Sequence, residues 1–142
     1  MQKRKSSESA EGIAVSRAME SMRPEKDRVI YDPYARLFLG NRWKKWMKNS
    51  FSVWLFTMLG NFRFPGFRGS IIARVRFMNE CIKQTFPSDF TQLVILGAGY
   101  DMSAYCFRDI LSDTRIFEVD HPNTQKDKMS KIKKYIESIP DN

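Results

Sequence analysis

The sequence is poor in the residues that build disulfide frameworks and metal sites. It has two cysteines, Cys81 and Cys106, and a single histidine, His121. Two cysteines are too few for a disulfide-stabilised scaffold, and together with one histidine they do not supply a His/Cys zinc site within this chain. We therefore expect no metal and no redox chemistry from these residues.

Long apolar runs are missing as well. The first residues, MQKRKSSESAEG, are basic but lack the apolar core of a signal peptide. No run approaches the ~20 apolar residues that a membrane-spanning helix needs. We therefore expect a cytoplasmic protein, with a flexible segment over residues 1–9.

Negative charge is scarce in the first part of the chain. Of the 142 residues, 42% are hydrophobic, which suffices for a packed domain, and the formal net charge is +8. Residues 1–90 hold 17 basic against 8 acidic side chains, whereas the remainder holds 7 against 8. This imbalance would suit an anionic partner, although net charge bears on association and not on fold.

The first ninety residues have helical periodicity. Apolar spacing predicts a helix from Ser9 or Ala10 to just before Pro24, and Asp32 with Pro33 indicates the start of a short one. Two longer helices are expected over 43–59 and 70–86, joined by a Pro/Gly-containing loop over 61–70. The basic first turns of helix 43–59 allow contact with an anionic membrane, but the pattern favours core packing.

The rest of the chain alternates strands and helices. QLVIL (92–96) is typical of a parallel strand covered on both faces, and RIFEVD (115–120) of a second strand. Helices are expected over 102–111 and from Pro122 to about Ser138. The sequence thus predicts a helical region over 10–90, followed by the start of an α/β domain over 91–142. Because two parallel strands do not form a stable sheet alone, we expect a truncated domain or a partner chain that completes the sheet.

A glycine turn follows the first predicted strand in VILGAGYD. Gly97 and Gly99 would let the backbone approach a ligand, and Glu118 and Asp120 end the next strand about twenty residues later, where a carboxylate can bind ribose hydroxyls. This order is typical of nucleoside-binding sites. Met102 occupies the position of the third glycine of the dinucleotide fingerprint, which argues against NAD.

Five segments carry a family resemblance. In order and spacing, the chain resembles the leucine carboxyl methyltransferase family and its microbial O-methyltransferase relatives, which are class I S-adenosylmethionine-dependent enzymes. The resemblance runs from about Val15 to Lys128 and rests on SRAMES, DRVIYDPYARLF, RGSIIARV, QLVILGAGYDMSAY and FEVDHPNTQKDK.

The resemblance implies a fold and a cofactor site. The fold would be the N-terminal part of a Rossmann-like class I methyltransferase, and the cofactor would be S-adenosyl-L-methionine. Its methionine part would lie against the glycine turn, its carboxylate would pair with an arginine, and two acids would hold the adenosine side. The implied binding residues are Arg74, Gly97, Ala98, Gly99, Asp101, Glu118 and Asp120, with Asp101 ordering the turn.

The predicted function is methyl transfer to a carboxylate or hydroxyl oxygen of an unidentified small-molecule or peptide acceptor. A carboxylate acceptor needs no general base, and the sequence assigns no catalytic residue. This chain alone is expected to be weakly active or inactive. Two alternatives stay open: a non-catalytic module that binds anionic lipid or nucleic acid through its basic N-terminal region, and a protein that binds NAD or another nucleotide. The resemblance favours the enzyme over a nucleic-acid or membrane-surface partner.

Other notable residues receive structural interpretations. His121 follows the strand-end acid and is expected to cap the next helix or face solvent instead of acting as a base. Cys106 is expected to pack on a helix face. Trp43, Trp46 and Trp54 are expected in the core, with a lid over the substrate as the alternative.

Overall fold

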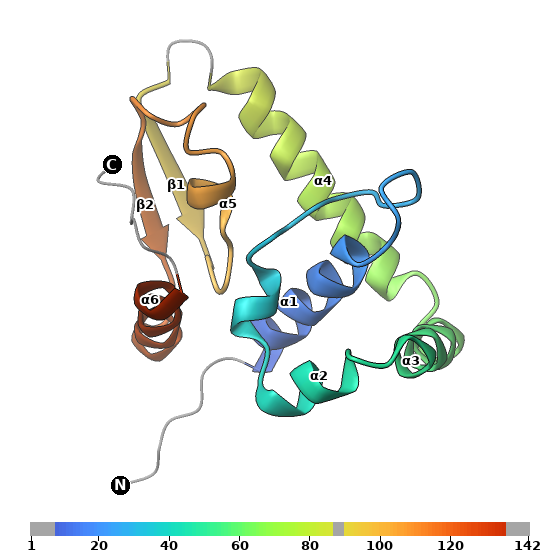
Figure 1. Ribbon diagram of the computed structural model, residues 1–142. Coiled ribbons are helices and arrows are strands. Elements are labelled where there is room, and N and C mark those ends of the chain that lie inside the picture. The colour runs from blue at the N-terminus through green and yellow to red at the C-terminus, as the bar shows by residue number, and fades with distance from the viewer. Residues whose placement is uncertain (1–7, 87–89, 136–142) are drawn as a thin grey trace, which may run out of the picture. The chain divides into compact units, whose positions relative to one another are not determined.

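The computed structural model describes residues 8–86 and 90–135, and it is a mixed α/β structure (Figure 1). Of the expected flexible segment over residues 1–9, residues 1–7 lie outside the described ranges. The expected helix end near Ser138 lies outside them as well. The elements are, in order, α1 (Glu8–Ser21), the 3-10 helix η1 (Ala35–Phe38), α2 (Asn41–Trp46), α3 (Ser50–Arg63), α4 (Phe67–Thr85), β1 (Gln92–Leu96), α5 (Ser103–Cys106), β2 (Arg115–Val119) and α6 (Pro122–Tyr135).

The chain divides into two compact units. One is Glu11–Phe77, and the other combines Met1–Ala10 with Met78–Asn142. The first contains helices only, and the second contains both strands.

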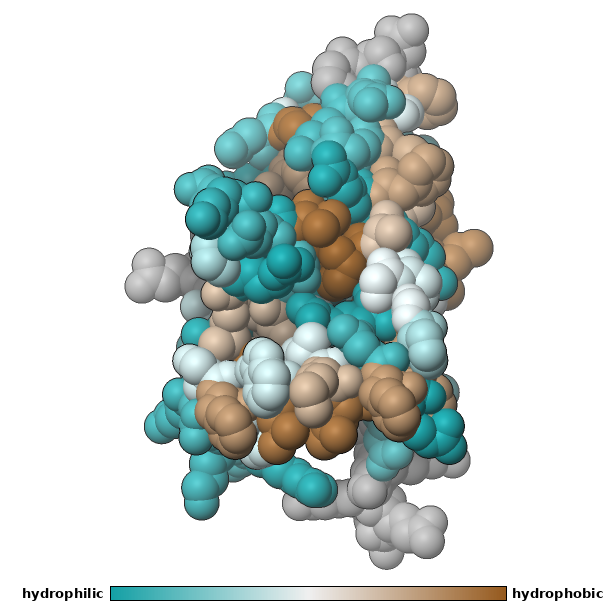
Figure 2. Space-filling model, turned by 90° about the vertical axis from the view of Figure 1, so that its right-hand side faces the viewer, coloured by the Kyte–Doolittle hydropathy of each residue, from teal (hydrophilic) through white to brown (hydrophobic). Residues whose placement is uncertain are grey.

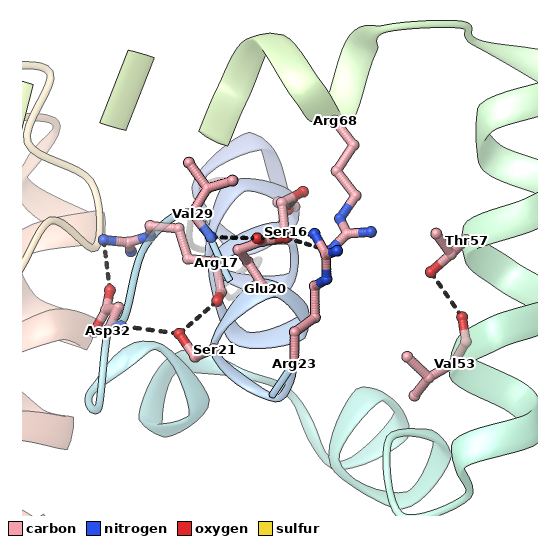
Figure 3. A network of polar contacts seen from close by, with 11 residues as sticks. Ser16, Arg17, Glu20, Ser21, Arg23, Val29, Asp32, Val53, Thr57 and Arg68 are labelled. Atoms are coloured by element: carbon pink, nitrogen blue, oxygen red, sulfur yellow. Dashed lines mark hydrogen bonds and ion pairs between the residues drawn. The ribbon is translucent and has the colours of Figure 1, made fainter. Parts of the chain in front are cut away.

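An ion pair within the helical unit joins α1 to the segment that follows it (Figure 3). Arg17 Nη1 lies 3.0 Å from Asp32 Oδ2, and both side chains are buried. Asp32 Oδ1 accepts the amide hydrogens of Tyr34 and Ala35, each at 2.9 Å, just before η1 begins. The predicted capping role of Asp32 is confirmed, although the element that it starts is a single 3-10 turn.

Glu20 forms a second polar centre on α1. Its carboxylate accepts from the amide of Val29 at 2.8 Å and from Arg23 and Arg68 at 3.2 and 3.0 Å. Burial lowers the pKa of the Arg68 guanidinium, while the charge of Glu20 raises it and that of Arg23 lowers it further. Buried charges require such compensation, so these contacts fix the loop after α1 against the helix.

The single helix expected over 43–59 is wrong, because the chain breaks between α2 and α3. Asn49 precedes α3 in an extended conformation, and its side chain accepts the amide hydrogen of Phe51 at 2.9 Å. Asparagine is a favoured N-cap because this bond replaces a missing intrahelical one. The periodicity of apolar residues continues across the break, so the sequence pattern did not reveal it.

The joint between α3 and α4 is shorter than the expected loop over 61–70. The first helix runs to Arg63 and the second begins at Phe67, so three residues connect them. Gly66 has a φ of 76° in this turn. Gly66 stands directly before α4, and its carbonyl accepts the amide hydrogen of Ser70 at 2.8 Å. Glycine adopts this left-handed conformation without steric cost.

In the second unit, β1 and β2 form a two-stranded parallel sheet. Its register pairs Gln92 with Arg115 and Leu96 with Val119. Both strands lie within one residue of their expected ranges. The helix expected over 102–111 is wrong: α5 ends at Cys106, and turns follow up to β2.

One face of this sheet is open. The inward residues Leu93, Ile95 and Ile116 are half-buried, whereas the side chains that alternate with them are exposed. The exposed set is Val94, Leu96, Phe117 and Val119. The prediction of a strand covered on both faces is therefore wrong for the described residues.

Among the residues that the structure describes, no helix combines the length and the apolar character needed to cross a bilayer.

Candidate functional site

The glycine turn connects β1 to α5 and is tied to the end of β2. Gly97 and Gly99 have φ values of 66° and 53°, in the left-handed region that side chains disfavour. The amides of Gly97 and Ala98 both donate to the carbonyl of Val119, at 2.8 and 3.2 Å. The turn therefore lies at the carboxyl ends of both strands, which is the edge of a parallel sheet where ligands bind.

Asp120 stands at the same edge, directly after β2. Its Oδ2 accepts the amide hydrogen of Gly99 at 2.5 Å, and its Oδ1 accepts that of His121 at 2.5 Å. Each carboxylate oxygen has two acceptor positions, so each retains one after these bonds. The structure thus brings together the glycine turn and the strand-end acid, which lie about twenty residues apart in the sequence.

Asp101 closes the other end of the turn. Its amide donates to the carbonyl of Ala98 at 2.7 Å, and its Oδ1 accepts the amide hydrogen of Ser103 at 2.8 Å. Its side chain is therefore engaged with the start of α5. Because α5 has only four residues, it offers far less of a helix N-terminus than the expected ten-residue helix would.

A contact that sequence reasoning missed attaches the turn to α6. The buried Tyr100 donates its hydroxyl hydrogen to Asp127 Oδ2 at 2.5 Å, and Lys131 Nζ lies 2.7 Å from the same oxygen. The ammonium of Lys131 also lies 4.9 Å from the centre of the Tyr100 ring. The spacing of Asp127 and Lys131, one helical turn apart, was a visible signal of their pairing, but nothing in the sequence indicated Tyr100.

Glu118 differs sharply from Asp120 in its surroundings. Both of its carboxylate oxygens accept from Lys128 Nζ, at 2.7 and 2.6 Å, and Lys128 is fully buried. Burial raises the pKa of the nearby Tyr105 phenol, and the charge of Glu118 raises it further. Sequence reasoning did not identify the burial of Lys128. The available signal was its spacing of four residues from Thr124 and Ile132, which are also buried.

Arg74 belongs to the other compact unit. It lies in the part of α4 that clusters with the helical unit, and its side chain is exposed. The other six predicted binding residues all lie in the unit that contains the sheet. The structure therefore gathers Gly97, Ala98, Gly99 and Asp120 at one edge of the sheet, whereas Arg74 lies in the helical unit.

Two secondary expectations have clear outcomes. Exposed His121 accepts the amide hydrogen of Asn123 on its Nδ1 at 3.2 Å, at the start of α6, so its capping role is confirmed. Cys106 is exposed, so the expectation that it packs on a helix face is wrong.

Alanine substitutions will distinguish the two glycines of the turn from an ordinary helical glycine. Left-handed strain is expected to cost about 1–2 kcal/mol of unfolding free energy at either position. Gly99→Ala should cost more than Gly97→Ala, because its methyl group would meet the Cβ of Ala10 at 3.3 Å while that of Gly97 meets open space. Gly12→Ala on α1 should instead stabilise, by about 0.5–1 kcal/mol. Urea unfolding measures all three, and equal losses at the three positions would contradict the assignment.

The fold and this edge define a class: a mixed α/β protein whose parallel strands end in a glycine turn and an acid, consistent with an α/β methyltransferase-like fold. Comparison with known proteins agrees. The family model described as leucine carboxyl methyltransferase matches residues 10–142. The chain belongs to this family.

Similar curated proteins bear related names. A candidate S-adenosyl-L-methionine-dependent methyltransferase of Rhodococcus jostii is 38% identical over 111 residues, covering 78% of this chain and 35% of the relative. One of Bacillus subtilis is 37% identical over 71 residues, covering 49% and 23%. One of Mycobacterium bovis is 31% identical over 115 residues, covering 78% and 33%. The chain thus spans about a third of the length of the Rhodococcus and Mycobacterium relatives.

Proposed function

We propose that this chain forms the nucleoside-binding N-terminal part of a class I methyltransferase with a Rossmann-like fold. Family membership and the names of the relatives make S-adenosyl-L-methionine the expected cofactor. The observation that carries the proposal is the bond between the Gly99 amide and Asp120, because it joins the glycine turn and the strand-end acid into one site. This is the pair of features that adenosine recognition needs.

The residues at this edge suit such a cofactor. A Cβ at Gly97 would meet nothing within 4 Å, so the backbone there is open to a ligand. The free acceptor position on each oxygen of Asp120 matches the two hydroxyl donors of a ribose. Glu118 is less suited, since Lys128 already occupies both of its oxygens. We therefore assign ribose recognition to Asp120 and a supporting role to Glu118.

The remaining binding roles follow from the family resemblance. Gly97 and Gly99 would lie against the methionine part of the cofactor, with Ala98 between them among the binding residues and Asp101 holding the turn in shape. Arg74 would pair with the cofactor carboxylate, for which the planar guanidinium fork is suited. Its exposure on α4 leaves the guanidinium available for such a contact.

The proposed reaction is methyl transfer to a carboxylate or hydroxyl oxygen of a small-molecule or peptide acceptor. The cofactor supplies an electrophilic methyl group when bound. The part of this chain is to hold and orient the nucleoside, since alignment of the reacting atoms and exclusion of water dominate such a displacement. The open sheet face and the chain's share of its relatives support completion of the site by further strands, from the same protein or a partner chain.

The test is isothermal titration of S-adenosylhomocysteine into the 142-residue chain. We expect saturable binding that Asp120→Asn weakens at least ten-fold, because the amide group cannot accept from Gly99, His121 and two hydroxyls together. Asp113→Asn removes the same charge from an exposed turn and is the matched control. NADH titrated under the same conditions tests the dinucleotide alternative.

The outcomes separate the possibilities. Equal binding to the wild type and Asp120→Asn would contradict the ribose assignment. Tighter binding of NADH than of S-adenosylhomocysteine would contradict the methyltransferase class. A folded wild type that binds neither ligand would mean that the site is not formed by this chain alone.

A further inference from the structure

Helix α3 presents a stripe of large apolar side chains to solvent. Phe51, Trp54, Met58 and Phe62 follow one another at helical spacing, and their exposed fractions are 65%, 57%, 47% and 88%. Leu59, beside them, is 53% exposed. Figure 2 faces the side that carries α3 and shows hydrophobic side chains gathered there. We call Phe51, Trp54, Met58 and Phe62 the α3 stripe.

The opposite side of the helix explains why the stripe points outward. Phe56 packs edge-on against Trp43 and Trp46 of α2, with ring centres 5.3 and 5.0 Å apart. Trp43 and Trp46 also contact each other, at 6.0 Å. These three rings attach α3 to α2 by the side of the helix opposite the stripe, although Phe56 itself is 39% exposed. The stripe cannot turn toward α2 without breaking this cluster. Trp43 and Trp46 are half-buried and contact each other and Phe56, so neither belongs to the fully buried core. Trp54 is exposed, so the expected core packing is wrong for it.

The segment around the stripe carries charge of one sign. Between Asp32 and Glu80 there is no aspartate or glutamate, whereas there are nine lysines and arginines. Lys45 and Lys48 are exposed just before α3, and Arg63 is exposed in its last turn, where it lies over the Phe64 ring at 4.9 Å. Cations thus flank the stripe at both ends.

We propose that the α3 stripe docks onto an anionic lipid surface. The fourteen residues of α3 span about 21 Å, long enough to lie along the boundary between headgroups and acyl chains. Its aromatic and aliphatic side chains would enter that boundary while Lys45, Lys48 and Arg63 remain among the lipid phosphates. An exposed apolar band flanked by cations is unfavourable for a protein in water unless another surface covers it.

The chemistry of the stripe favours lipid over nucleic acid. Single-stranded nucleic acid would stack its bases on aromatic rings, but Met58 and Leu59 interrupt the rings of α3 with aliphatic side chains that do not stack. Both kinds of side chain enter a lipid boundary equally well. The proposal does not depend on the methyltransferase assignment, since α3 and its flanking cations lie wholly within the helical unit.

Vesicle flotation with the 142-residue chain tests the proposal. The vesicles are phosphatidylcholine alone or phosphatidylcholine with phosphatidylglycerol. We expect partition onto the anionic vesicles, a blue shift of tryptophan emission, and weaker binding at high salt. Trp54→Ser/Phe62→Ser should reduce partition at least ten-fold. Lys45→Gln/Lys48→Gln should reduce it about five-fold for each cation removed.

Matched controls keep the test sharp. Phe77→Ser/Met78→Ser removes two exposed apolar side chains from α4, and Lys126→Gln/Lys133→Gln removes two exposed cations from α6. Both controls should bind like the wild type, and circular dichroism confirms that every variant is folded. The proposal would be overturned if the chain did not partition onto vesicles, or if it partitioned equally onto neutral and anionic vesicles. It would also be overturned if Trp54→Ser/Phe62→Ser partitioned like the wild type. Stripe-dependent dimerisation without vesicle binding, or stripe-dependent DNA binding without vesicle binding, would overturn it as well.

Discussion

Asp32→Ala is expected to lower the unfolding free energy of the helical unit by about 3–5 kcal/mol, the range for breaking a buried ion pair from one side. The substitution removes the ion-pair partner of the buried Arg17 and the acceptor for the amides of Tyr34 and Ala35. All three tryptophans lie within the helical unit, so tryptophan fluorescence during urea unfolding reports on it directly.

Two further substitutions divide this effect into its parts. Asp32→Asn keeps an oxygen for the two amides but loses the charge, so it should fall between wild type and alanine. Glu25→Gln breaks an exposed pair with Arg28 at 3.4 Å and should cost less than about 1 kcal/mol. A loss for Asp32→Ala no larger than that for Glu25→Gln would show that the buried pair does not stabilise the unit.

Glu118→Gln is expected to destabilise the sheet-containing unit by about 3–5 kcal/mol, because it leaves the ammonium of Lys128 buried without its counter-charge. Glutamine keeps the size of the side chain, so the loss reports charge and not packing. Far-UV circular dichroism during urea unfolding, compared with the tryptophan signal of the helical unit, assigns the loss to the correct unit.

Lys128→Met completes a double-mutant cycle. Alone it should cost less than Glu118→Gln, since the Glu118 side chain retains some contact with water. The double variant Glu118→Gln/Lys128→Met should recover most of the stability, because apolar replacement of a whole buried pair is often nearly neutral. Glu80→Gln, which breaks an exposed pair with Lys83, is the control. Additive losses in the double variant would mean that the two side chains are not coupled.

The sequence predicted elements well where local chemistry determines them. The strand over 92–96 and the cap at Asp32 depend on neighbours close in the chain, and both are confirmed. The break at Asn49 was missed because apolar periodicity runs through it. The short α5 was missed because residues 107–110 form turns where the sequence predicted further helix. Whether Val94 and Leu96 are covered depends on neighbouring elements, which periodicity cannot supply.

The candidate site was predictable as a set of residue types but not as a geometry. The glycines after one strand and the acids at the end of the next marked the carboxyl edge of the sheet. The sequence could not show that Glu118 is occupied by Lys128 while Asp120 keeps acceptor positions, because both acids occupy equivalent places in the pattern FEVD. Tyr100 was missed because its partner, Asp127, lies 27 residues away.

The bonds of Asp120 to two backbone amides have an entropic consequence. A free aspartate samples several rotamers, and fixing an interface side chain on binding costs about 0.5–1.5 kcal/mol when that side chain is rich in rotamers. Asp120 is already held in one orientation by the amides of Gly99 and His121. The side-chain entropy of Asp120 is therefore lost when the protein folds. A nucleoside that binds at the sheet edge does not have to immobilise this carboxylate again.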